Sequence, residues 1–158
     1  MKKSMKLIAL LLASLMLMTS IAFAATSSKE EPGDKTKKQT GRYTEYITYS
    51  DGTAAVRGTK KSTYNHKIKR IFKTTKIKGK KYTITQINKN AFAKMKKLKI
   101  VKVYSTRALK VQKGAFGKLN TKKITVKVTK KMSAKNFKKF KKNLRKAGFK
   151  GKIVRVKL

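Results

Sequence analysis

The chain of 158 residues contains no cysteine, no tryptophan, one proline and one histidine. The absence of cysteine excludes disulfide bonds, thiolate zinc sites, thiol nucleophiles and lipid attachment through a lipoprotein cysteine. Any folded part must therefore be held together by burial of apolar side chains, without covalent cross-links. The chain is long enough for one modest core and too short for two.

Acidic residues are also scarce. The chain has only five, and all of them precede position 52: Glu30, Glu31, Asp34, Glu45 and Asp51. Of the 45 Lys and Arg residues, 37 follow position 51, and the formal net charge is +40. Internal salt bridges cannot neutralise such an excess, so the composition predicts affinity for polyanions. Charge alone does not choose among nucleic acid, acidic glycans, cell-wall polymers and anionic lipid headgroups.

The scarcity of titratable groups argues against catalysis, because general acid–base chemistry needs two positioned groups. Ser62, His66 and Asp51 can be written down as a triad, but no nucleophile elbow or phosphate-binding loop surrounds them. His66 has no neighbouring acid or cysteine in the sequence, so we expect a surface or turn histidine. The sequence therefore predicts no enzymatic activity, no cofactor and no metal site.

Residues 1–25 have the pattern of a secretory signal peptide. A lysine-rich start precedes an apolar run from Leu7 to Phe23, and an Ala-Phe-Ala sequence ends at Ala24. This pattern predicts cleavage after Ala24 or Ala25 and a secreted or cell-surface protein. The alternative is an uncleaved membrane anchor, because the apolar run is about 18 residues long, at the lower limit for crossing a bilayer.

The mature chain is predicted to begin with a flexible tether, residues 26–41, which holds the single proline and three of the acids. Residues 42–83 alternate apolar and polar side chains, with turn signals at Ser50–Thr53 and around Gly79. This pattern favours strands joined by tight turns. We therefore expect an N-terminal β cap over residues 42–83.

Residues 84–130 contain a motif that occurs twice. The pairs Ala91-Phe92 and Ala115-Phe116 lie 24 positions apart, and a Val-x-Val segment follows each. A period of this length is typical of repeats that stack as solenoid coils. We expect Phe92 and Phe116 to stack on one another and the two Val-x-Val strands to lie side by side. The segment Asn88–Leu98 fits either a short helix or a series of turns.

The last segment, residues 131–158, is predicted to close the stack with a helix and a strand. Apolar residues from Phe137 to Ala147 recur at helical spacing, with Ser133 as a candidate N-cap and Gly148 as a candidate C′ residue. The remaining residues alternate again, as in a strand. We expect this segment to cap the repeats at their C-terminal end.

The motif Ile-x-x-x-Ala-Phe-x-x-Met-x-x-Leu-x-x-Val-x-Val at Ile87–Val103 resembles the BspA-like leucine-rich repeat found on surface proteins of gut-dwelling Gram-positive bacteria. The lysine-rich ending is similar to the C-terminal segments of those proteins. The chain departs from the family by having Asn88 and Gln112 where glycine is frequent, and by having only two repeats.

The resemblance implies an α+β repeat fold, a short leucine-rich-repeat solenoid of about two coils. An N-terminal β-hairpin cap and a C-terminal helix-strand cap would cover its ends. It also implies a non-enzymatic binding or adhesion module. We expect its cationic surface to engage anionic cell-wall or host polymers, or another surface protein, and no small-molecule substrate.

Two alternatives stay open: a cationic secreted protein that binds nucleic acid or membranes, and a structural repeat remnant with no dedicated ligand. The densest basic cluster is the candidate polyanion site, and it comprises Lys138, Lys139, Lys141, Lys142, Arg145 and Lys146.

Overall fold

The structure is a computed structural model that describes the backbone from residue 35 to residue 158 and the side chains from residue 41 onward. The predicted signal peptide and most of the predicted tether lie outside the described residues. The described part carries ten strands and one α-helix. It contains no helix that is both long enough and apolar enough to cross a membrane.

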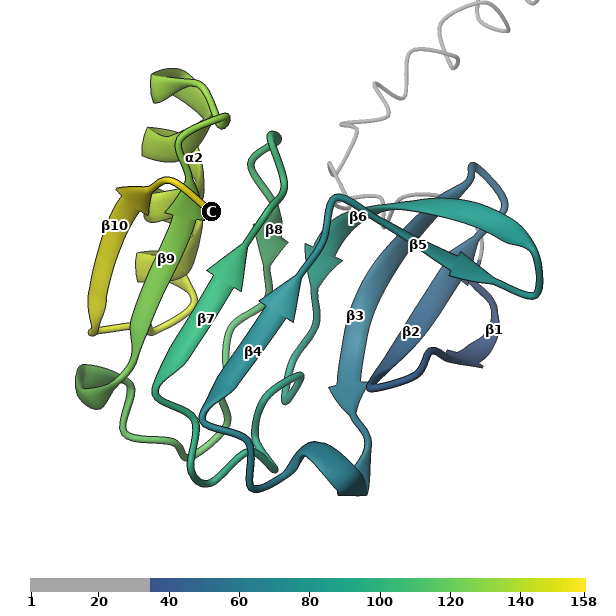
Figure 1. Cartoon of the computed structure of the whole chain (residues 1–158), viewed down its shortest axis with the longest axis horizontal. Coiled ribbons are helices and arrows are strands. Elements are labelled where there is room, and N and C mark those ends of the chain that lie inside the picture. The colour runs from purple at the N-terminus through teal and green to yellow at the C-terminus, as the bar shows by residue number, and fades with distance from the viewer. Residues whose placement is uncertain (1–34) are drawn as a thin grey trace, which may run out of the picture. The chain divides into compact units, whose positions relative to one another are not determined.

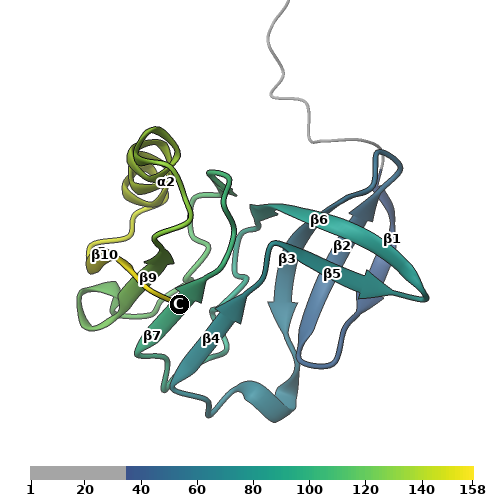
Figure 2. The same ribbon diagram turned by 45° about the horizontal axis from the view of Figure 1, so that its top comes forward.

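The first sheet has the strand order β1-β2-β3-β6-β5, with β8 also paired to β6. The β2–β3 and β5–β6 pairs are antiparallel hairpins, as predicted. The second turn needs a left-handed backbone at Lys78 (φ 49°) and Gly79 (φ 78°), and glycine adopts this conformation without strain. Figure 2 shows how this sheet curls. Its strands are β1 (Lys35–Thr40), β2 (Thr44–Tyr49), β3 (Thr53–Thr59), β5 (Thr74–Ile77), β6 (Lys80–Ile87) and β8 (Lys110–Val111).

The second sheet is parallel throughout and has the order β10-β9-β7-β4 (Figure 1). In the register of β7 and β9, Val101 lies opposite Val126 and Val103 lies opposite Val128. The predicted pairing of the two Val-x-Val strands is therefore confirmed. The strands of this sheet are β4 (Ile68–Ile71), β7 (Ile100–Val103), β9 (Thr125–Thr129) and β10 (Lys152–Val156).

The helix α2 (Ala134–Lys146) forms the crossover between the parallel strands β9 and β10. At its start, the Ser133 hydroxyl accepts a hydrogen bond from the Asn136 backbone N–H at 3.3 Å. At its end, Gly148 has φ 89° and the Phe149 N–H donates to the Leu144 carbonyl at 3.0 Å, the Schellman arrangement. Both predicted caps are confirmed.

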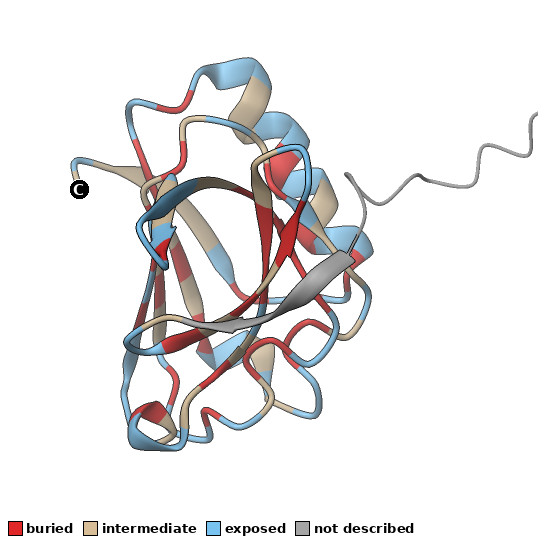
Figure 3. Ribbon diagram, turned by 90° about the vertical axis from the view of Figure 1, so that its right-hand side faces the viewer, coloured by how far each residue is buried: buried red, intermediate tan, exposed pale blue. Residues whose placement is uncertain are grey.

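One hydrophobic core lies between the two sheets and draws residues from both. The Phe92 and Phe116 rings are in contact, with centroids 5.1 Å apart, so the predicted contact is confirmed. Their planes are tilted by 52°, so the rings do not stack in parallel. The Phe149 ring, 4.9 Å from Phe116, extends the row to three rings and was not predicted. Along the strands, buried positions alternate with more exposed ones (Figure 3).

The predicted fold class is wrong. The described residues form a predominantly β structure of two sheets with one helix, and not an α+β leucine-rich-repeat solenoid of about two coils with separate end caps. Residues 88–98 form turns, so the first repeat contributes no helix. The segment 42–83 supplies most of the curled sheet and also β4 of the parallel sheet. Two short repeats bury too little apolar surface alone. The strands of segment 42–83 contribute further residues to their hydrophobic core.

Candidate anion-binding surfaces

The predicted polyanion site lies on α2. Lys138, Lys139, Lys141, Lys142 and Lys146 are all exposed, whereas Phe140 and Leu144 on the opposite side are buried in the core. We call these five lysines the α2 basic face. Helical periodicity produces the separation, because residues three or four positions apart share a side of the helix. None of the five is in an ion pair with another described residue, so their positive charge is available to a ligand.

Arg145, the sixth residue of the predicted site, has a different role. Its Nη1 donates to the Phe149 carbonyl at 2.7 Å and to the Gly151 carbonyl at 2.9 Å. Its guanidinium also lies 5.8 Å from the centre of the Phe149 ring. Arg145 therefore holds the turn that follows α2, and its replacement would disturb the fold as well as the charge.

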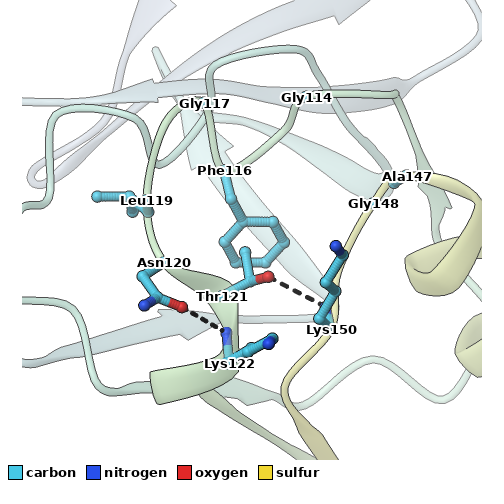
Figure 4. A pocket seen from close by; sticks show the side chains of 10 residues that line it. All are labelled: Gly114, Phe116, Gly117, Leu119, Asn120, Thr121, Lys122, Ala147, Gly148 and Lys150. Atoms are coloured by element: carbon cyan, nitrogen blue, oxygen red, sulfur yellow. Dashed lines mark hydrogen bonds between the residues drawn. The ribbon is translucent and has the colours of Figure 1, made fainter.

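A groove of about 360 Å³ lies at the C-terminal end of α2 (Figure 4). Phe116 points into it, and Lys122 and Lys150 stand on its rim. The Thr121 hydroxyl accepts a hydrogen bond from the Lys150 backbone N–H at 3.0 Å, which joins the repeat to the segment after the helix. Ala147 and Gly148, at the end of α2, also line this groove, so it places two further lysines near the C-terminal end of the helix.

The outer face of the parallel sheet carries a second group of cations. Arg70 on β4, Lys102 on β7 and Lys127 on β9 occupy the same register position. Each is flanked in its strand by buried residues that face the core, so the three side chains face outward. The flanking residues are Lys69 and Ile71 on β4, Val101 and Val103 on β7, and Val126 and Val128 on β9. We call these three residues the basic row. Adjacent strands lie about 4.8 Å apart, and like charges directly opposite one another are destabilising. An anionic ligand would relieve this repulsion.

Lys69 is the basic residue that the sequence reasoning missed. It faces the core side of β4 and is only 5% exposed. Its Nζ donates to the Tyr43 carbonyl at 3.2 Å and to the Thr44 hydroxyl. Burial lowers the pKa of Lys69 from 10.5 to about 8, because the charged form loses its hydration. The available signal was strand periodicity, since Ile68 and Ile71 are three apart and cannot share a face.

The buried Lys69 ammonium makes stability depend on pH in the alkaline range. The folded protein binds fewer protons than the unfolded chain between pH 8 and 10.5, so its free energy of unfolding rises with pH in this window. Relative to a Lys69→Met variant, we expect the wild type to gain on the order of 3 kcal/mol across it. Urea denaturation at several pH values measures this gain.

The comparison with the methionine variant isolates the contribution of Lys69 to the pH dependence of the unfolding free energy. A difference in unfolding free energy that stays constant across this pH range would contradict a desolvated ammonium. Lys69 lines a pocket beside β4, and the other ionisable residues of this pocket are present in both proteins, so they do not contribute to the difference between them. These residues are Arg42, Tyr43, Tyr46, His66, Arg70 and Lys76.

The residues of the conceivable triad are not brought together. Asp51 lies in the turn before β3, where its carboxylate accepts from the Thr53 N–H at 2.8 Å. Ser62 and His66 lie beyond the other end of β3, and seven extended residues span about 20 Å. His66 is exposed and its backbone N–H donates to the Thr63 carbonyl, so the prediction of a surface or turn histidine is confirmed. Between residues 35 and 158, no three His, Asp or Glu side chains gather as a metal site.

Comparisons with known proteins add no relative: no family model, no curated protein and no solved structure matches the chain.

Proposed function

We propose that the protein is a non-enzymatic binding module whose cationic surface engages anionic cell-wall or host polymers. The observation that carries this proposal is the concentration of exposed lysines on the α2 basic face, none of which is in an ion pair with another described residue, in a chain with no acidic residue after position 51. The basic row adds a second cationic stripe. From the signal-peptide pattern and the resemblance of the repeats to bacterial surface proteins, we further propose that it acts outside the cell or on its surface.

The α2 basic face suits an extended polymer better than a single small anion. The helix has 13 residues and is about 20 Å long. A polymer lying along it meets several lysines at once, and each new contact becomes intramolecular after the first. Binding of this kind releases counterions, so it weakens steeply with added salt and discriminates poorly among polymers.

The first test replaces Lys138, Lys142 and Lys146 by glutamate. These three side chains are exposed on α2 and none hydrogen-bonds to another described residue, so we expect the fold to be retained. Binding to an acidic glycan such as heparin, measured at 0.15 M NaCl, should weaken by at least about tenfold, because three charge contacts become repulsive. The dependence of log Kd on log salt should also become shallower.

The matched control reverses Lys73, Lys80 and Lys81, which are equally exposed but belong to the β5–β6 hairpin and the loop before it. Both variants change the net charge by the same amount. An equal loss of affinity in the control would mean that net charge alone drives binding and that α2 is no site. Retention by wild type that is unchanged at high salt would contradict the electrostatic proposal itself.

Single-stranded nucleic acid is the second candidate ligand, for one specific reason. The exposed Phe72 ring stacks on Tyr104 with centroids 5.2 Å apart, and both residues directly follow the strands that carry Arg70 and Lys102. Aromatic platforms beside cations are how sequence-tolerant proteins hold unpaired bases. Displacement of the bound glycan by an oligothymidylate at lower concentration than by a glycan of equal charge would favour this candidate.

A further inference from the structure

A second pocket, of about 550 Å³, lies between β4 and the start of β2. This volume is within the range of small-molecule binding sites. Its lining includes Tyr43, Thr44, Ile68, Lys69, Phe72 and Met95. The pocket is distinct from the α2 basic face, because it adjoins β4 at one edge of the parallel sheet whereas α2 lies near β9 and β10 at the other end of the strand order (Figure 1).

Lys69 lies in this pocket at a position of β4 whose counterparts in the neighbouring strands are aliphatic. Its register partners across the parallel sheet are Val101, Val126 and Ile153. A lysine in such a row is costly, because its charge is desolvated and no carboxylate of the described residues pairs with it. A lysine ammonium has three N–H donors, and two are used by the Tyr43 carbonyl and the Thr44 hydroxyl. The third donor and the charge are left for a ligand.

Exposed apolar side chains also line this pocket. From residue 41 onward, three large hydrophobic side chains are exposed: Tyr43 at 47%, Ile68 at 37% and Phe72 at 52%. All three line this pocket. Exposed apolar side chains that gather beside a buried cation are typical of a ligand site, since single ones would scatter over the surface.

We propose that this pocket binds a small organic carboxylate with an apolar ring. The carboxylate would pair with the Lys69 ammonium, and the ring would pack against Tyr43, Ile68 and Phe72. Arg42, Arg70 and Lys76 also line the pocket but are exposed to solvent, so Lys69 is the one buried cation of the lining. One buried ammonium matches one negative charge, which favours a carboxylate over a doubly charged phosphate. This specific site goes beyond the proposed polymer binding and does not depend on it.

The test compares 3-phenylpropionate with its neutral amide, 3-phenylpropionamide, by NMR titration of the full chain in 0.3 M NaCl. We expect the wild type to bind the acid at least about tenfold more tightly than the amide, because the amide cannot neutralise a buried cation. Lys69→Met should reduce this preference to less than about twofold. Lys73→Met removes an exposed lysine that does not line the pocket, and it should leave the preference unchanged.

Phe72→Ala tests the apolar half of the site and keeps the proposal falsifiable if Lys69→Met does not fold. It should weaken the acid and the amide to a similar extent, about fivefold. Equal binding of acid and amide by the wild type would overturn the proposal, and so would a preference that survives in Lys69→Met. Binding of acetate as tight as that of 3-phenylpropionate would show general anion attraction and also overturn it. The glutamate variant of the α2 basic face should keep the preference, so the two proposals can fail separately.

Discussion

Replacement of Phe116 by alanine is expected to lower the free energy of unfolding by about 3 to 5 kcal/mol. The ring is 3% exposed and lies between Phe92 at 5.1 Å and Phe149 at 4.9 Å. Its removal would leave a cavity at the contact between the two repeats and the segment after the helix. The backbone N–H groups of Phe92 and Phe149 are hydrogen-bonded, so these residues can shift little and their rings can fill the space only in part. Chemical denaturation followed by circular dichroism measures the loss.

Phe72→Ala is the matched control, because it removes the same atoms from a ring that is 52% exposed. We expect it to cost about 1 kcal/mol or less, mainly the stacking on Tyr104. If Phe116→Ala were no more destabilising than Phe72→Ala, the central position of Phe116 in the core would be wrong.

Gly151→Ala is expected to destabilise the protein by more than about 4 kcal/mol, a range that single substitutions rarely reach. A Cβ atom at this position would lie 2.0 Å from the Ile124 carbonyl oxygen and 2.2 Å from that of Thr121. Both contacts are with backbone, so no side-chain rotation can relieve them. The chain passes here directly beneath the turn of Thr121–Lys123 before it enters β10. Alanine would therefore push β10 away from β9.

Gly79→Ala serves as the control for the glycine substitution. Gly79 lies at the tip of the β5–β6 hairpin with φ 78°, and a Cβ there would meet nothing within 4 Å. The expected cost is about 1 to 2 kcal/mol, from the left-handed backbone alone. Thermal unfolding of both variants gives the comparison. A Gly151→Ala protein as stable as Gly79→Ala would show that the chain at residue 151 has room to move.

The features that could be predicted from the sequence depend on short stretches of chain. The two hairpins follow from turn residues, and the ends of α2 follow from Ser133 and Gly148, because each signal acts within a few residues. The contact of Phe92 with Phe116 was predictable because the motif occurs twice at one spacing. The Phe149 ring had a local signal too, since the residue after a C′ glycine often packs back on its helix.

The fold class could not be obtained in this way because strand order depends on distant pairings. The repeat pattern shows that β7 and β9 are alike, but not that β4 extends their sheet or that β3 pairs with β6. The sequence left a short helix and a series of turns both open for Asn88–Leu98, and the polypeptide uses turns there. The family resemblance implied a solenoid, whereas the repeats obtain their second layer from the hairpin strands.

The candidate sites also differ in whether they depend on local sequence or on distant strand pairings. The α2 basic face could be predicted because it lies on one helix and requires only helical periodicity. The basic row could not, because Arg70, Lys102 and Lys127 meet only through the register of three strands. The burial of Lys69 could not be predicted from the neighbouring residues, since a lysine beside an arginine is usually exposed. Arg145 was included in the predicted polyanion site as a surface charge. Its hydrogen bonds could not be predicted from helical periodicity, because both carbonyl partners lie beyond the end of its helix.

The position of β10 has a consequence for the order of folding. Antiparallel hairpins such as β2–β3 close locally and form within microseconds, whereas parallel strands need a crossover and pair slowly. Here the crossover is α2, and the Phe149 ring and β10 come after it. A chain that emerges from its N-terminal end would thus acquire its hairpins early. Its core would stay open until residues 149–156 arrive to close it.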